Sequence, residues 1–270
     1  MQRLSIFAKG NVDVHDSLHS CTIAGELQWN GVNEILRSRY TGALIRLKHE
    51  TWTRSDALLA APGKVPAELK TRGLPLGAYP LESQFSTALF ETRADAIVLS
   101  IQPDTATGLV RRRDDGFLFY PNESASWPAP DREWLKGAFE TLGQLDVAQS
   151  MSNFEQIIDR IRLGTEAPIL IYNLSPILPG EMVHCLQGLG ETFATRIRRF
   201  NLGLADLSER TGVSIIDVDS LLARKGADRL KLDAFHLTAE GYRLVAEEVV
   251  RVLEDLGLLQ PQEANLCASA

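Results

Sequence analysis

Short runs of mostly apolar residues recur along the chain, with enough residues between them for a helix. Five such runs lie at 4–8, 43–47, 96–101, 168–172 and 213–218. A strand covered on both faces is apolar at nearly every position, whereas a half-exposed strand alternates. Strands of this kind that alternate with helices are typical of parallel sheets. The pattern therefore predicts an α/β fold, a three-layer α/β/α sandwich with a central five-stranded parallel sheet.

Apolar positions at helical spacing fill the intervals between these runs. The last helix is the best marked, because Tyr242, Val245, Val249 and Leu253 repeat on one face and Thr238 is a good N-cap. Asp115-Gly116 lies between apolar stretches and predicts a hairpin over 109–120. The other helices are expected at 23–39, 85–91, 131–142, 152–162 and 191–211, and the Pro- and Gly-rich stretch 62–80 is expected to be irregular.

No internal repeat divides the chain, so one domain is the simplest organisation. We expect this domain at 1–258, with a hairpin or lid insertion at about 105–130 and a mobile tail at 259–270. Cys21, Cys185 and Cys267 are odd in number and widely spaced, which indicates neither a disulfide framework nor a zinc site. Reduced thiols and a short N-terminal apolar run favour a cytoplasmic protein without a signal peptide.

The charge and hydropathy of the chain exclude some partners. The formal net charge is −7, so no basic surface for nucleic acid is expected. No stretch approaches the roughly 20 apolar residues of a membrane span. His15 and His19 lie near Asp13 and Asp16, but their spacing fits no standard metal site, so neither a metal nor another cofactor is expected. A homo-oligomer remains possible.

An acid and a histidine stand three positions apart just before the last helix. A carboxylate such as Asp233 can hold the imidazole of His236 in one tautomer and stabilise its charged form. The stretch Asp-x-x-His followed by Leu-Thr-x-x-Gly-Tyr resembles the last sequence block of the SGNH (GDSL-type) hydrolases, and strand number and spacing resemble that family over residues 3–257. The resemblance implies a flavodoxin-like topology and a Ser-His-Asp triad that contains Asp233 and His236.

Two alignments of the nucleophile region are open. By motif, Asp16-Ser17-Leu18 matches the family's Asp-Ser-Leu, which makes Ser17 the nucleophile if Val12 to Asp16 continue the first strand. By strand position, Gly10-Asn11-Val12 takes the place of the family's Gly-Asp-Ser and puts valine at the nucleophile position. Ser17 would then be part of a helix start, without a catalytic role.

Other polar residues follow the strands, where ligands bind in parallel sheets. Gln102 stands in the place of the family's oxyanion-binding Asn and offers the same amide donor on a longer side chain. No Gly occurs in 49–56, where the family has a second oxyanion donor. Asn11, Asn173, His49 and Glu50 are further candidates for substrate contacts, although His49 and Glu50 also suit a solvated loop.

These residues predict a serine esterase or acyl hydrolase for an ester of a small metabolite or carbohydrate. Ser17 would attack the carbonyl, His236 would transfer the proton, and Asp233 would orient His236. The alternative is a non-hydrolytic relative of the same fold, either an acyltransferase or a ligand-binding protein without a working nucleophile. A fully apolar side chain at Val12 favours that alternative.

Overall fold

A parallel sheet of five strands forms the centre of the protein, as the apolar runs predict. The computed structural model describes residues 2–23, 25–40, 42–181 and 189–260. The strands lie in the order β10-β9-β5-β1-β4, and all neighbouring pairs are parallel. Numbered along the chain, this is the 2-1-3-4-5 order of flavodoxin-like sheets. The strands are β1 Gln2–Lys9, β4 Ala43–Glu50, β5 Ala96–Ser100, β9 Ile169–Tyr172 and β10 Ser214–Ile216.

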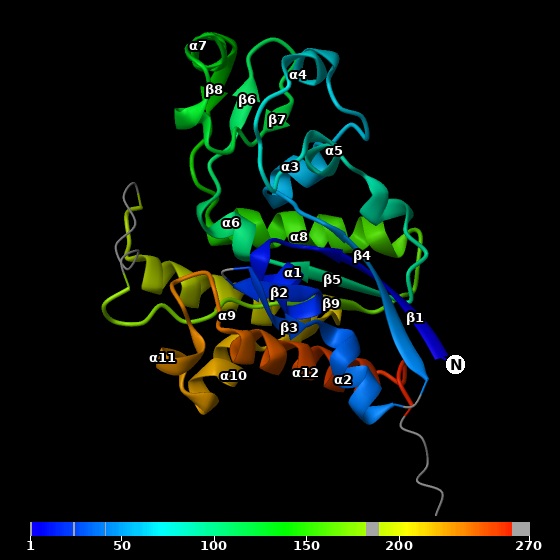
Figure 1. The fold of residues 1–270 in the computed structure, drawn as a ribbon. Helices are drawn as coiled ribbons and strands as arrows, with labels where there is room; N and C mark the ends of the chain where they lie inside the picture. The colour runs from blue at the N-terminus through cyan, green and yellow to red at the C-terminus, as the bar shows by residue number, and fades with distance from the viewer. Residues whose placement is uncertain (1, 24, 41, 182–188, 261–270) are drawn as a thin grey trace, which may run out of the picture.

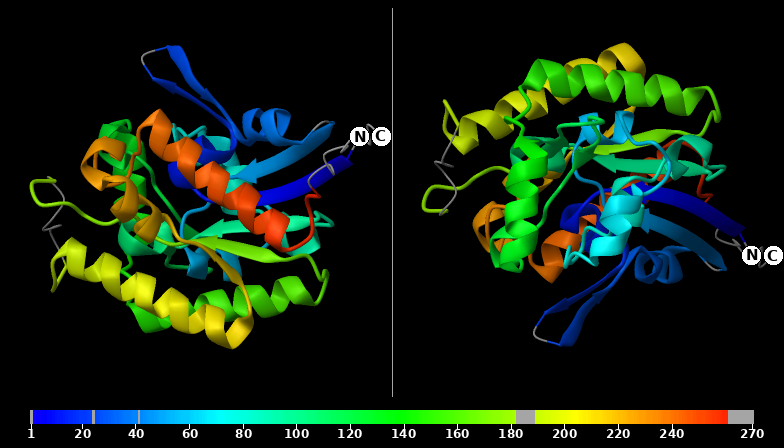
Figure 2. Two further views of the ribbon diagram at one scale, coloured as in Figure 1. Left: turned by 90° about the horizontal axis from the view of Figure 1, so that it is seen from below. Right: turned by 90° about the horizontal axis from the view of Figure 1, so that it is seen from above.

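Helices cover both faces of this sheet and make it the middle of three layers (Figure 1). Each face has its own apolar core, because the fully buried strands send alternate side chains to opposite sides. Figure 2 shows α12 across one face, with α8 and α9 on the other. One layer holds α1 Val12–Leu18, α2 Val32–Arg39, α10 Val218–Lys225, α11 Ala227–Leu230 and α12 Ala239–Asp255, and the other holds α3 Ser55–Leu59, α8 Val147–Arg162 and α9 Phe193–Thr211.

A smaller subdomain rises above the sheet (Figure 1). It contains a three-stranded antiparallel sheet in the order β7-β6-β8 and a separate apolar cluster centred on Phe119, Trp127 and Phe139. The hairpin predicted at 109–120 is present as β6 and β7. We call residues 61–91 and 107–145, the two segments on either side of β5 and the short helix that follows it, the cap. Its elements are α4 Ala67–Arg72, α5 Leu81–Gln84, a 3₁₀ turn at Ala88–Glu91, β6 Val110–Arg112, β7 Leu118–Phe119, a 3₁₀ turn at Ser124–Ser126, α7 Ala129–Ala138 and β8 Phe139–Thr141.

Three of the expected helices are wrong in part. Of the helix expected at 85–91, only a 3₁₀ turn at Ala88–Glu91 is present. Residues 23–39 begin with an antiparallel hairpin of β2 (Ser20–Ile23) and β3 (Glu26–Asn30), and only α2 is helical. Gly31 separates the hairpin from the helix at a φ of 80°, where an added Cβ would lie 2.7 Å from the carbonyl oxygen of Leu18. The helix expected at 131–142 ends at Ala138, because the following residues pair with β6.

Several expectations fall at the edges of the described residues. The tail from 261 onward, Cys185 and Cys267 lie outside them, whereas Cys21 is buried and unbonded. None of the described helices combines the length and apolar character that crossing a membrane requires.

Candidate active site

Asp233 and His236 form a hydrogen-bonded pair on a short loop before α12. His236 Nδ1 lies 2.8 Å from Asp233 Oδ2 and 2.9 Å from Oδ1. A carboxylate only accepts, so the ring proton resides on Nδ1 and Nε2 is left as a base. The two side chains are about half exposed, at 55% and 48%. The dyad predicted from the sequence is thus formed and open to a substrate.

Hydrogen bonds fix the backbone of the loop that carries Asp233 and His236 at both of its ends. Asp233 Oδ1 accepts the backbone N–H groups of Phe235 and His236 at 2.8 and 2.9 Å. Lys231 and Leu237 pair as an antiparallel bridge, and the Thr238 hydroxyl caps α12 by accepting Gly241 N–H at 3.2 Å. Burial opposes ionisation of Asp233, but hydrogen bonds from Phe235 and His236 outweigh it and hold the pKa of its carboxyl below its usual value.

The dyad opens onto a cavity of about 410 Å³ where the sheet meets the cap. Asn11 and Val12 line it from the end of β1 and the start of α1, and Gln102 lines it from the start of α6, Gln102–Ala106. Tyr79 and Tyr120 line it from the cap. The carboxyl ends of β1 and β5 therefore meet the dyad at one place, as expected for ligand sites in parallel sheets.

Val12 occupies the position that follows Gly10 and Asn11 at the turn from β1 into α1. An added Cβ on Gly10 would lie 2.4 Å from Val14 Cγ2, so only glycine lets the helix begin this close to the strand. The alignment by motif required Val12 to Asp16 to continue the strand, and this condition is not met, because α1 begins at Val12. The position of the turn favours the alignment by strand position.

The structure does not bring Ser17 together with His236. Ser17 is completely buried, and its hydroxyl lies 2.8 Å from the carbonyl oxygen of Asp13 and 3.0 Å from the hydroxyl of Tyr172. It does not line the cavity that His236 lines. The cause is the helix, which carries Ser17 more than a turn beyond the cavity. Ser17 as nucleophile stays a prediction, and this geometry counts against it.

Two amides in the cavity offer donors to a developing oxyanion. The side-chain amide of Gln102 makes no hydrogen bond with the described residues, so it is free for a ligand. Asn11 Oδ1 is an acceptor that is buried without a partner in the described structure, so only the amide nitrogen of Asn11 can serve as the donor. Donors that are already fixed near a reacting carbonyl stabilise the negative charge of the transition state. These two residues stand where the sequence predicted them.

Three other candidates have structural partners. His49 Nε2 donates to the carbonyl oxygen of Gly10 at 2.9 Å, and Glu50 accepts from buried Lys9 at 3.0 Å. Asn173 joins the ends of β9 and β10, since its amide nitrogen lies 2.7 Å from Asp217 Oδ1. None of the three lines the cavity with His236. They position the strand ends around the site, and their predicted contact with substrate stays untested.

Two tyrosines, Tyr79 and Tyr120, form an aromatic wall of the cavity that the sequence analysis did not predict. Tyr79 and Tyr120 pack edge to face with ring centroids 4.8 Å apart. Burial raises the pKa of Tyr79 to about 12, so its hydroxyl is a neutral hydrogen-bond donor. Tyr79 lies in the Pro- and Gly-rich stretch that was expected to be irregular. Only the isolated aromatic residues before Pro80 and Pro121 could have marked it.

A group of three histidines lies near the end of β4. The ring centroids of His15, His19 and His49 are 5.0 to 5.7 Å apart. Within the described residues, no set of three or more His, Cys, Asp or Glu side chains is arranged to hold a metal ion.

Residues 119–244 match the model of the GDSL-like Lipase/Acylhydrolase family. The resemblance to the SGNH (GDSL-type) hydrolases is confirmed. The matched part contains Asp233 and His236 but not the β1–α1 turn. The match supports acyl hydrolysis as the general class of activity.

Solved structures with the same fold span nearly the whole chain. A lipase/acylhydrolase from Enterococcus faecalis has a TM-score of 0.53 at 12% identity, with 98% of this chain and 100% of that chain covered. A variant of an acetyl-xylooligosaccharide esterase from Geobacillus has a TM-score of 0.50 at 11% identity, with coverage of 96% and 97%. At such identities the likeness shows the fold alone. No curated protein matches the chain.

Proposed function

We propose that this protein transfers an acyl group from a small ester to water or an alcohol, with the Asp233–His236 dyad as a general base that acts directly on the acceptor. The observation that carries the proposal is the shared cavity. His236, Gln102 and Asn11 line it together with an apolar Val12, which takes the place of the family's serine in the alignment by strand position. In the mechanism proposed here these residues supply a base and oxyanion donors, and no side chain forms a covalent intermediate.

The reaction follows from these positions. His236 Nε2 takes the proton of the acceptor hydroxyl while the hydroxyl oxygen attacks the ester carbonyl carbon, and the carbonyl π electrons move onto oxygen. Gln102 and Asn11 donate to this oxyanion. When the carbonyl reforms, the bond to the alcohol breaks and its oxygen takes the proton back from Nε2. Asp233 keeps the imidazole oriented and stabilises its positive charge throughout.

The cavity lining favours a neutral, polar substrate. Among the described residues that line it, only His236 and the tyrosines are ionisable, and hydroxyl or amide groups come from Thr51, Thr107 and Gln102. An ester of a small polyol or carbohydrate suits such a surface, because each hydroxyl has a neutral partner within reach. The tyrosine pair offers an aromatic face for the sugar ring.

Ester hydrolysis and fluorophosphonate labelling test the proposal together. We expect slow hydrolysis of activated acetyl esters, a loss of 10²-fold or more in kcat in His236→Ala, and no labelling of the wild-type protein. His15→Ala is the matched control, since that histidine lies outside the cavity. Labelling of the wild type that disappears in Ser17→Ala would overturn the direct mechanism and restore the serine-hydrolase reading.

A ligand-binding protein without turnover is the second candidate, and the valine at position 12 is the observation in its favour. In that case His236→Ala would weaken the binding of a polyol ester in calorimetry, and neither the variant nor the wild type would hydrolyse it.

The acceptor of the acyl group, water or an alcohol, can be identified from the products. If an alcohol is the acceptor, a transesterified product should form when glycerol is added.

A further inference from the structure

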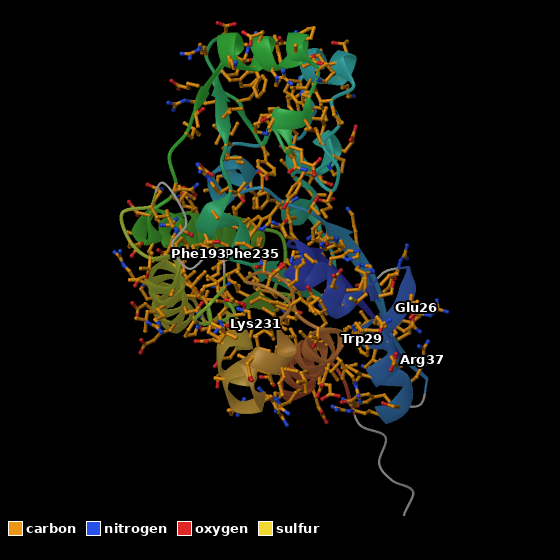
Figure 3. The ribbon with its side chains drawn as sticks, turned by 60° about the vertical axis from the view of Figure 1, so that its left-hand side comes forward. Glu26, Trp29, Arg37, Phe193, Lys231 and Phe235 are labelled. Carbon is orange, nitrogen blue, oxygen red and sulfur yellow. The ribbon has the colours of Figure 1, made fainter. Side chains whose placement is uncertain are left out.

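A second, smaller chamber adjoins the cavity that contains the dyad. It has a volume of about 30 Å³, and Gln102, Thr105 and Phe235 line both spaces and form the partition between them. Figure 3 shows Phe235 beside Phe193, whose ring centroid lies 5.7 Å away. A substrate carbonyl held at Gln102 would thus have a large space on one side and a small one on the other.

The walls of this chamber combine apolar and polar side chains, and the polar ones belong to Asp13, Gln102, Thr105, Tyr172, Asn173 and Ser175. Leu174, Ile197, Val218, Ala234 and Val245 contribute aliphatic side chains from the surrounding loop and helices. Its volume corresponds to roughly two or three heavy atoms, since a water-sized group needs about 10–15 Å³ on this scale. A short acyl group fits there, while a butyryl or longer chain does not.

One polar group in the chamber lacks a partner. The carboxyl of Asp13 reaches the chamber from the first turn of α1, and Ser100 Oγ donates to its Oδ2. Its other oxygen, Oδ1, is buried and has no hydrogen-bond partner in the described part of the chain. Leaving a buried carboxyl oxygen unpaired costs about 1–3 kcal/mol, so a ligand that supplies the missing partner gains binding free energy.

We propose that the chamber is the subsite for the acyl group of the substrate, and that Asp13 selects a two-carbon acyl group that carries a 2-hydroxyl over plain acetyl. The proposal rests on the proposed function, because it places the ester carbonyl beside Gln102 and His236. Asp13 is here a specificity-determining residue and takes no part in proton transfer at the carbonyl.

A hydroxyl is the substituent that suits Asp13 best. Burial raises the pKa of the Asp13 carboxyl, although hydrogen bonds from Ser100 and from nearby backbone N–H groups partly oppose this effect. Oδ1 can therefore accept a hydrogen bond or, when protonated, donate one. A hydroxyl can do both, whereas an ammonium requires the ionised carboxylate and a methyl group offers nothing.

The test compares 4-nitrophenyl esters of acetate, glycolate, butyrate and hexanoate, each rate being divided by its spontaneous hydrolysis rate. We expect the wild type to prefer glycolate to acetate by about tenfold in normalised kcat/KM, the size of one hydrogen bond. Asp13→Val should bring that ratio to about one, and Asp13→Asn should keep part of it. Butyrate should be at least tenfold poorer than acetate, and Ile197→Ala, which enlarges the chamber, should recover it.

Binding provides a readout that does not depend on turnover. Glycolamide, a neutral mimic of the acyl group, should bind the wild type more tightly than acetamide in calorimetry, and Asp13→Val should abolish the difference. Equal binding of the two amides, or His236-dependent hydrolysis with a glycolate-to-acetate ratio near one, would overturn the subsite and leave the function intact. Hydrolysis that is unchanged in His236→Ala would instead overturn the function.

Discussion

Val12 and His236 line the same cavity, whereas Ser17, on the same helix as Val12, is fully buried away from it. This relationship separates the base of the site from the only serine that the family motif selects. In the proposed mechanism, Val12 at the start of α1 is the side chain that stands in place of a nucleophile. The site can therefore be tested by adding a nucleophile as well as by removing one.

Val12→Ser should create an activated serine. A hydroxyl at this position would share the cavity with His236, and a serine next to a histidine base is the arrangement that reacts with fluorophosphonates. We expect labelling in Val12→Ser and none in Val12→Ala, which removes the same bulk without adding a hydroxyl. Combining Val12→Ser with His236→Ala should abolish the labelling. Mass spectrometry of the labelled peptide locates the modified residue, and an unlabelled Val12→Ser protein would show that the dyad does not reach this position.

Ser17→Ala should lower stability and leave ester hydrolysis intact. The Ser17 hydroxyl is the partner of the buried Tyr172 hydroxyl at 3.0 Å, so its removal leaves that hydroxyl unpaired. The expected loss is about 1–3 kcal/mol in the free energy of unfolding, measured by urea denaturation. Adding Tyr172→Phe should cost little more, because the unpaired group is then gone. A folded Ser17→Ala protein without activity would contradict this structural role.

The sheet was predictable because burial alone determines its pattern. Strands covered on both faces are apolar at nearly every position, and β5 and β9 are completely buried. The hairpin before α2 was missed because Trp29 is buried at a spacing that also fits a helix, and its environment depends on α12 rather than on its neighbours in sequence. Gly25 and Gly31, both at positive φ, were the local signal.

The site was predictable where its residues are adjacent in sequence. Asp233 and His236 lie on one loop, so their spacing and the Thr238 cap sufficed. Whether Ser17 or Val12 faces His236 depends on where α1 begins, and the sequence alone does not determine that residue. The aromatic wall of the cavity and the small chamber that Asp13 lines are each built from segments far apart in the chain, so no local sequence pattern reveals them.

Acidification should destabilise the protein through His49. Burial lowers the pKa of His49 to about 4 from its ordinary value of 6.5. The hydrogen bond to the Gly10 carbonyl partly opposes this shift, and the charges of His15, His19 and Lys9 add to it. Between these values the unfolded chain binds more protons than the folded one, so stability is complete above pH 6.5 and falls as pH falls. The group should account for a loss of about 2 kcal/mol between pH 7.5 and pH 5.

His49→Gln should remove that part of the pH dependence, because the amide can still donate to Gly10 but does not titrate. Urea denaturation at the two pH values measures the difference. His15→Gln is the comparison variant: its ring is about half exposed, and because His15 contributes to the lowered pKa of His49, its loss should reduce the pH dependence in part, whereas His49→Gln removes it. A slope in His49→Gln equal to that of the wild type would assign the acid sensitivity to other groups.

Breaking the ion pair of Lys231 and Glu181 should reduce both stability and activity. Lys231 Nζ lies 2.9 Å from Glu181 Oε1 and also donates to the Pro176 carbonyl, and both side chains are largely buried. Figure 3 shows Lys231 on the same side of the molecule as Phe235. Lys231 begins the loop that holds the dyad. Glu181 follows the segment from Leu174, which lines the small chamber. The ion pair therefore connects these two segments.

Glu181→Leu leaves the ammonium buried without its counter-charge, which costs about 3–5 kcal/mol in the free energy of unfolding. Adding Lys231→Met should restore most of this stability, because no buried charge is then unpaired. Activity separates the two roles of the pair: if it only stabilises the fold, the double variant recovers kcat as well. We expect the other result: the ion pair also positions the dyad, so the double variant regains its stability but its kcat stays several-fold below that of the wild type.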